Sequence, residues 1–314
     1  MRTLRVAMGM AAVLMLVAPA FGQGEKEGQG QAVVTILPKH AGDTVPDLSA
    51  QDIKLKVDGK DANVSNLVAL RGTHDNLELV VLIDGGARSS LGNQLDELSK
   101  FIISLPPNAR VAVAYMEFGR AVFQSQLSTD HAAAARGLHL PAGIPGSNGS
   151  PYFCISDLAK RWPQGDGTAR REVLMVTDGV DEYNRRYDPE DPYVQAAAND
   201  AVRAGLVVYA IYFRNQGRAD NTRYENNAGQ NLILQVTDAT GGKSFWEGTG
   251  NPVSFDPFLE ELGRRLRNQY ELSFLAHSNG KPTIQNLKLK VSAPGTEVDS
   301  PHQVLVARPG LAQN

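Results

Sequence analysis

The chain has 314 residues, of which 42% are hydrophobic and 21% are charged, as is usual for a globular protein. Its formal net charge of -3 excludes the basic footprint of a nucleic-acid-binding protein, so we expect no nucleic-acid partner. The single cysteine, Cys154, excludes an internal disulfide framework. The apolar core must therefore hold the fold without covalent cross-links.

The first 22 residues have the pattern of a secretory signal peptide. Arg2 and Arg5 precede an apolar run over residues 6–17, and small residues flank Phe21, which suits cleavage near Gly22. A membrane anchor is the weaker alternative, because the run is shorter than the ~20 residues that a membrane-spanning helix needs. We therefore predict export to the periplasm or the extracellular space, with no transmembrane segment in the mature chain.

The two flanks of the chain predict a small β domain. Residues 23–31 contain no apolar side chain, which predicts a flexible leader. Within residues 32–72, the alternating stretch 53–57 and the hairpin signal Asp58-Gly59 favour antiparallel strands. Strand-like segments recur at 270–276, 284–291 and 304–307. We predict that residues 269–308 pair with 32–72 in one domain, followed by a tail at 309–314.

Residues 77–268 alternate between strand and helix patterns. The apolar run 77–83 is typical of a strand that is buried on both faces. Further strands are predicted at 111–118, 121–127, 172–177, 206–213 and 243–246, and helices at 90–104, 130–137, 150–162, 193–204, 231–239 and 255–268. This order predicts an α/β, doubly wound, Rossmann-like domain: a mostly parallel sheet with helices on both faces.

Two of these strands end in aspartate. Asp84 follows the first strand, Asp178 follows the strand at 172–177, and a glycine-rich loop between them leads to Ser150. The carboxyl ends of parallel strands meet at one edge of a sheet, which is where ligands bind in open α/β folds. Two carboxylates and a hydroxyl at that edge suit a hard divalent cation.

The order and spacing of these residues resemble the von Willebrand factor A-type domain. In that family the first strand ends in Asp-x-Ser-x-Ser, a middle loop supplies a threonine, and a later strand ends in Thr-Asp-Gly. The resemblance covers about residues 77–268. The stretches Leu-Ser-Ala-Gln-Asp-Ile-Lys-Leu-Lys-Val-Asp-Gly-Lys at 48–60 and Gln-Tyr-Glu-Leu-Ser-Phe at 269–274 are similar to a bacterial group of VWFA-related proteins. The resemblance implies a metal-ion-dependent adhesion site, which binds Mg²⁺ and an acidic residue of a partner protein.

The metal ligands of that family are only partly present. Asp84 and Asp178 match, whereas the two serine positions fall on Gly86 and Arg88, and the threonine position falls on Ser150. Gly86 offers no side-chain oxygen, and Arg88 carries donors and a positive charge but no acceptor. We hypothesise that the Arg88 guanidinium replaces the metal and neutralises the aspartates. The alternative is that Arg88 extends into solvent.

The site is therefore predicted to be degenerate, with no cofactor. Mg²⁺ held by Asp84, Ser150 and Asp178 is the alternative. Charged residues cluster after Asp178, at Asp181, Glu182, Arg185 and Arg186. Their spacing matches no calcium-binding loop, so we interpret them as a solvated rim that helps to bind a partner.

The sequence contains no Gly-x-Ser-x-Gly, His-Glu-x-x-His or phosphate-binding loop motif. We therefore predict that the chain is not an enzyme, and a hydrolase is the least favoured hypothesis. The favoured function is an exported, adhesion-type domain that binds a protein partner at the carboxyl edge of the sheet, independently of metal. The alternatives are metal-dependent adhesion and an inert scaffold that binds its partners through the flanking β domain.

Overall fold

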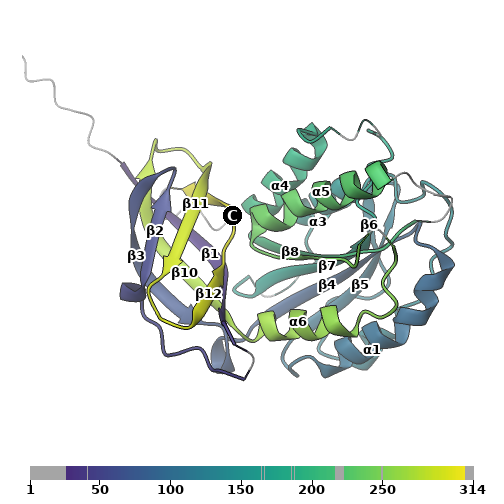
Figure 1. The fold of residues 1–314 in the computed structure, drawn as a ribbon, viewed down its shortest axis with the longest axis horizontal. Helices are drawn as coiled ribbons and strands as arrows, with labels where there is room; N and C mark the ends of the chain where they lie inside the picture. Colours follow the sequence, from purple (N-terminus) through teal and green to yellow (C-terminus); the bar gives the residue numbers. More distant parts are fainter. Residues whose placement is uncertain are drawn as a thin grey trace, which may run out of the picture.

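The computed structural model describes residues 26–40, 42–163, 165, 167–184, 186, 188–215, 223–248 and 250–307. The predicted signal peptide, its cleavage site near Gly22, and the tail at 309–314 lie outside these residues. The described chain forms an all-β unit and an α/β unit, which lie side by side (Figure 1).

The α/β unit is built around a six-stranded sheet with the order β6-β5-β4-β7-β8-β9. Its strands are β4 (Leu77–Asp84), β5 (Arg110–Glu117), β6 (Arg120–Phe123), β7 (Arg170–Thr177), β8 (Leu206–Tyr212) and β9 (Ser244–Phe245). All neighbours pair in parallel except β5 and β6, which form an antiparallel hairpin. Every residue of β4 is buried, which explains its continuous apolar run.

Helices cover both faces of this sheet. The helices α1 (Leu95–Ser104), α2 (His131–Ala135) and α6 (Asp256–Leu266) pack on one face, and α3 (Pro151–Lys160), α4 (Pro192–Arg203) and α5 (Arg223–Thr240) pack on the other (Figure 1). The arrangement confirms the predicted α/β class. None of the helices within the described ranges combines the length and apolar character that crossing a membrane would take.

Two helices differ from their predicted extents. The segment after Arg88 begins as a 3-10 helix, Ser89–Gln94, and becomes α-helical only at Leu95. Gly92 and Asn93 are poor helix formers, which accounts for the change. Helix α5 begins at Arg223, eight residues before the predicted 231, because its first turns are polar and hid the apolar stripe.

The flanks form a closed antiparallel barrel. Its strands are β1 (Lys26–Pro38), β2 (Ile53–Val57), β3 (Lys60–Ala69), β10 (Gln269–Ser278), β11 (Thr283–Val291) and β13 (Gln303–Ala307), and β12 (Thr296–Asp299) is added beside β1. The ladder runs β10-β3-β2-β11-β13-β1 and returns to β10. Short 3-10 helices, Ala50–Asp52 and Gly72–His74, lie in the connections. The strand β12 had no counterpart in the sequence prediction.

The prediction of a flexible leader over 23–31 is wrong from Lys26 onward. Residues 26–31 form the first half of β1 and pair with β10, with Gly30 opposite Phe274. Buried Gly28 and Gly30 alternate with exposed Gln29 and its neighbours, so the strand has one inward face. A Cβ atom at Gly30 would overlap the ring of Phe274. The barrel interior requires glycine there, and glycine conceals the strand from a hydrophobic pattern.

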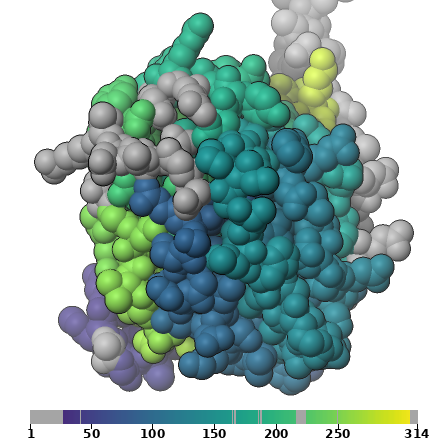
Figure 2. All heavy atoms as spheres, turned by 90° about the vertical axis from the view of Figure 1, so that its right-hand side faces the viewer, coloured from purple at the N-terminus to yellow at the C-terminus, as the bar shows by residue number. Residues whose placement is uncertain are grey.

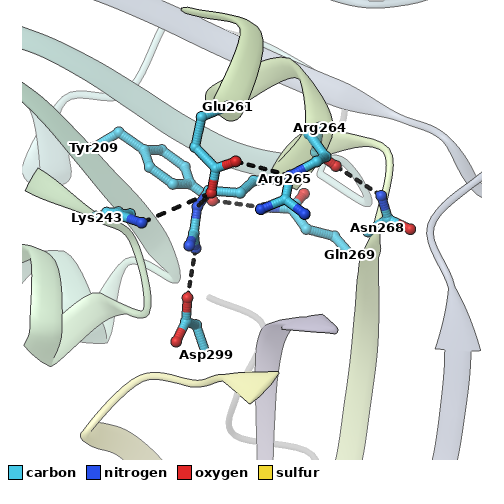
Figure 3. Close-up of polar contacts among 8 residues, drawn as sticks. All are labelled: Tyr209, Lys243, Glu261, Arg264, Arg265, Asn268, Gln269 and Asp299. Carbon is cyan, nitrogen blue, oxygen red and sulfur yellow. Dashed lines mark hydrogen bonds and ion pairs between the residues drawn. The ribbon is translucent and has the colours of Figure 1, made fainter. Parts of the chain in front are cut away.

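The barrel packs against the amino end of the sheet through a polar junction (Figure 3). Arg265, near the end of α6, is buried, and its guanidinium lies 2.9 Å from Glu261 and 2.7 Å from Asp299 on β12. Gln269 Nε2 donates to the hydroxyl of Tyr209 at 3.1 Å. These contacts join the two units at a fixed position.

Candidate functional site

The order of the strands reverses between β4 and β7. In chain order the sheet is arranged 3-2-1-4-5-6, and β4 and β7 are the first and fourth strands. The connections after these two strands run to opposite sides, which leaves a crevice at their carboxyl ends. Asp84 is the last residue of β4, and Asp178 follows β7. The fold therefore brings both aspartates to the switch point.

The Asp84 carboxylate is buried and receives hydrogen bonds from neutral groups. Its Oδ1 accepts from the Gly86 N–H at 2.9 Å, and its Oδ2 accepts from Asn148 Nδ2 at 3.0 Å and Thr177 Oγ1 at 2.7 Å. Burial and the nearby Asp178 charge raise the pKa of Asp84 to about 7, although the hydrogen bonds from Thr177 and Gly86 lower it in part. Burial therefore makes Asp84 a weaker acid than an exposed aspartate.

Asn215, just after β8, lies between the two carboxylates. Its backbone N–H is 3.4 Å from Asp178 Oδ2, and its Nδ2 is 3.5 Å from Asp178 Oδ1. A side-chain hydrogen bond from Asn215 also lowers the pKa of Asp84. Asp178 accepts a further hydrogen bond from the Val180 N–H at 3.0 Å. A neutral carboxamide thus contacts both aspartates.

Gly86 and Arg88 support this arrangement. A Cβ atom at Gly86 would lie 3.3 Å from Asn215 Nδ2 and 3.3 Å from Asp84 Oδ1, so the carboxamide fills the space that a side chain would need. Arg88 Nε donates to the backbone oxygen of Asn215 at 3.0 Å. Arg88 therefore contributes to the site by holding the Asn215 backbone.

The loop residue that reaches Asp84 is Asn148, two positions before the predicted Ser150. Ser150 Oγ accepts from the Phe153 N–H at 3.4 Å as the N-cap of α3, and it also hydrogen-bonds Asp181. The match of Ser150 to the family's threonine position stays a prediction, and in this structure the Ser150 side chain caps α3. A glycine-rich loop has no periodic pattern that would set its alignment.

The predicted rim is only partly a surface. Asp181 is buried, and its Oδ1 accepts from the N–H groups of Tyr183 and Asn184, so it orders the loop after β7. Burial raises its pKa. Glu182 is half-buried and Arg186 is exposed. Arg185 lies outside the described residues.

The groups that reach Asp84 are arranged as hydrogen-bond donors. Two of the three are N–H groups, and only the Thr177 hydroxyl also has an oxygen that Mg²⁺ could use. Gly86 supplies no hydroxyl, and Asn215 occupies the space beside it. No group of three or more His, Cys, Asp or Glu side chains in the described chain is arranged to hold a metal.

Three residues of the site escaped the sequence analysis: Asn148, Thr177 and Asn215. Two of them carried a usable signal. Thr177 is the last residue of β7, and Asn215 follows β8, so both lie at the same edge as Asp84. Polar residues at the ends of neighbouring parallel strands are expected to converge.

Exposed apolar side chains gather on the same edge. Figure 2 looks onto the side of the α/β unit that contains it. Nine large hydrophobic residues in the described chain are exposed, and the seven from the loops and helix starts at this edge are Phe118, Leu140, Ile144, Tyr183, Tyr193, Tyr224 and Val253. The other two are Ile103 and Val122. Clustered exposed apolar groups of this kind mark interaction surfaces.

Part of this surface is a connected aromatic group. The Phe153 ring lies 5.3 Å from Tyr183 and 5.0 Å from Tyr193, centroid to centroid. Phe118 forms the β5–β6 turn with Gly119, and its φ of 48° is in the left-handed region that a bulky residue rarely adopts. Its ring is 75% exposed, so burial does not explain why an aromatic residue stands there.

No protein-family model and no curated protein matches the chain. Solved structures similar to it include an aerotolerance-related membrane protein from Bacteroides fragilis (14% identity, covering 60% of this chain and 98% of that one, TM-score 0.42). Another is a conserved hypothetical protein, BatB, from Bacteroides thetaiotaomicron (15%, 60% and 97%, TM-score 0.43). A third is a von Willebrand factor type A protein from Catenulispora acidiphila (12%, 92% and 76%, TM-score 0.42). Identities and scores this low carry no information about function.

Proposed function

We propose that the chain is an exported, adhesion-type interaction domain that binds a protein partner at the carboxyl edge of its sheet, without a metal ion. The observation that carries the proposal is the gathering of seven exposed large hydrophobic residues at that edge. Tyrosine and phenylalanine are enriched in protein interfaces, and tyrosine is among the residues that most often dominate the binding energy. The signal-peptide pattern of residues 1–22 supports export.

Two further features support a binding role over catalysis. Both aspartates are buried, and their oxygens accept hydrogen bonds from protein groups. A general acid or base must reach a proton on its substrate, which these carboxylates do not. They act as a polar anchor that fixes the loops carrying the apolar surface.

Site-specific photo-crosslinking tests where the partner binds. Tyr183 is replaced by p-benzoylphenylalanine in the full chain, and Ile103, which is 55% exposed on α1 away from the edge, is the matched control. In extracts of the source cells, ultraviolet light should give a discrete adduct from position 183 and none from 103. Equal adducts at both positions, or none at 183, would favour the scaffold alternative.

Thermal unfolding with Mg²⁺ or Mn²⁺ tests metal independence. We expect ~1 mM of either metal to leave the melting temperature of the wild type unchanged. The triple variant G86S/R88S/N215A restores two hydroxyls and removes the carboxamide, so it should gain stability from metal, by about 2.7 kcal/mol at a hundredfold excess over Kd. Clear stabilisation of the wild type would support the metal-dependent alternative. Asn148 Oδ1 and Asn215 Oδ1, which are buried without a recorded partner, would then be the oxygens that turn toward the ion.

A further inference from the structure

The outer face of the barrel carries lysines in directly opposed pairs. On β2 and β11, Lys56 stands opposite Lys288, and Lys54 stands opposite Lys290. All four are exposed, whereas Leu55 between them faces the barrel core. Like charges that face each other across a ladder are destabilising. The arrangement keeps four ammonium groups on one surface of a chain whose net charge is -3.

This surface has little internal compensation. Among the ion pairs of the described residues, one carboxylate reaches the four lysines: Asp61, at 3.4 Å from Lys56, with both side chains largely exposed. An exposed pair of that kind contributes little, because water and salt screen it. A bound anion would remove the repulsion that the fold itself leaves in place.

The lysine surface continues into a cleft between the two units. Lys288 and Lys290 line this cleft, which has a volume of about 600 Å³, and Lys243 of the α/β unit lines it as well. Figure 3 shows the adjoining network, in which Lys243 Nζ lies 3.7 Å from Glu261 and Asp299 is paired with Arg265. Such a volume is within the range of ordinary ligand sites. Cationic groups therefore enter the cleft from both units, and they share its lining with the carboxylates of Asp238 and Asp299.

The cleft also contains a strand edge. β11 pairs with β13 as far as Asn286 and with β2 from Leu287 onward, so in the described chain no strand pairs with its other side beyond that point. The Leu287 N–H donates to the His302 oxygen at 2.8 Å, on that other side. Backbone groups of alternate residues along an antiparallel strand point to the same side. The N–H and C=O of Leu289 therefore point away from β2, as those of Leu287 do.

We propose that an extended acidic segment of a partner protein adds to this edge of β11. Its backbone would pair with Leu289, and its carboxylates would meet Lys288, Lys290 and Lys243. Strand addition of this type takes affinity from the main chain and specificity from alternate side chains. The concave shape favours a peptide over a lipid surface, because a flat bilayer could touch Lys54 and Lys56 but not the cleft. The site lies at the opposite end of the central sheet from the aromatic edge and does not depend on it.

Fluorescence anisotropy with a labelled peptide of about nine alternating Glu and Val residues tests the proposal. The double variant K288E/K290E should bind this peptide at least about tenfold more weakly than the wild type, whereas K100E, a single exposed change on α1, should stay within about twofold. A version of the peptide with alternate N-methylated amides keeps its carboxylates but cannot donate backbone hydrogen bonds to the edge of β11. Its affinity should also fall at least about tenfold.

Four results would overturn the proposal. They are no binding to the wild type, equal losses in K100E and the double variant, undiminished affinity of the N-methylated peptide, and vesicles of phosphatidylglycerol binding with the same lysine dependence. A different role is that the lysines only protect the edge from self-association. In that case, K288S/K290S would form dimers or larger species in size-exclusion chromatography, and the wild type would not bind the peptide.

Discussion

The two ends of the central sheet both bury carboxylates, but they do so in different ways. At the carboxyl end, Asp84 accepts hydrogen bonds from Gly86, Asn148 and Thr177, all neutral. At the amino end, buried glutamates face guanidinium groups. Glu78 lies 2.9 Å from Arg110, and Glu172 lies 3.3 Å from Arg170.

The two ends of the sheet also differ in how far they are covered. The barrel packs against the amino end of the sheet (Figure 1). The carboxyl end exposes aromatic side chains and a strained turn. We infer that the amino end holds the two units together. At the carboxyl end, the exposed aromatic side chains and the strained turn lower the stability of the fold but leave a surface that a partner can bind. Variants at the two ends should therefore respond with different magnitudes and, at one position, with opposite sign.

The largest effect is expected from Arg170→Met at the amino end. Arg170 contacts Asp75 at 2.8 Å and Glu172 at 3.3 Å, and both Arg170 and Glu172 are buried. Removing the guanidinium leaves a buried charge without its partner, which typically costs about 3–5 kcal/mol. Urea unfolding at pH 8, where Glu172 is ionised, measures the loss. The edge variant Thr177→Val removes one neutral donor from Asp84 and should cost only about 1–3 kcal/mol.

The double variant R170M/E172M is the control for this comparison. It removes both charges and replaces them with apolar volume, so it should recover most of the stability that R170M loses. If the double variant is as unstable as R170M, packing rather than charge pairing holds the junction. If Thr177→Val costs as much as R170M, the two ends do not differ in the way described.

The pH dependence of stability tests what the two ends share. Burial raises the pKa of Asp84 from 3.8 to about 7 and that of Glu172 from 4.5 to about 7. Between those values the folded protein holds protons that the unfolded chain has released. Stability should therefore be greatest in acid and fall as the pH rises toward about 7, by up to about 1.4 kcal/mol per pH unit for each group. Urea unfolding at pH 5, 6, 7 and 8 measures this slope.

Asp84→Asn and Glu172→Gln separate the two contributions. Each variant removes one titrating group, so each should remove that group's contribution to the change of the free energy of unfolding with pH. A free energy of unfolding that rises from pH 5 to pH 8 would contradict both pKa shifts. If only Glu172→Gln flattens the slope, Asp84 is ionised in the fold and the neutral donors at the edge are stronger than inferred.

Much of the fold could be predicted because burial leaves a pattern in the residues. The run Leu79–Ile83 is apolar because both faces of β4 are covered, and the alternation at Ile53–Val57 follows from one solvated face. The first half of β1 could not be predicted in this way. Its inward positions are Gly28 and Gly30, which are buried because Phe274 and Val306 fill the space above them. A scale based on apolar side chains does not register them.

The site was predictable at strand ends and not in loops. Asp84 and Asp178 follow regular strands, so their meeting follows from the topology. Asn148 lies in an irregular loop, where only the folded backbone decides which side chain points inward. The contact that Arg88 makes with Asn215 was not predictable for a related reason. Sequence indicates its charge, but the contact of its Nε with the Asn215 carbonyl depends on how two loops meet.

The smallest expected effect has the opposite sign and lies at the edge, in Phe118→Asn. Phe118 and Gly119 both have positive φ, 48° and 76°, in the two-residue turn between β5 and β6. Asparagine followed by glycine is the favoured pair for such a turn, and left-handed geometry costs most other residues about 1–2 kcal/mol. The exposed ring loses little burial, so urea unfolding should show a gain of about 1 kcal/mol.

The same substitution should weaken binding, because it removes a ring from the aromatic surface. Its measure is a reduced yield of the photo-crosslink at position 183 when both changes are combined. Val122→Asn is the matched control: it is also exposed, on the neighbouring strand β6, but has no strained backbone to relieve. A Phe118→Asn protein that is more stable and still binds fully would mean that the strain serves something other than the partner. One that is less stable would mean that the ring packs more tightly than its exposure indicates.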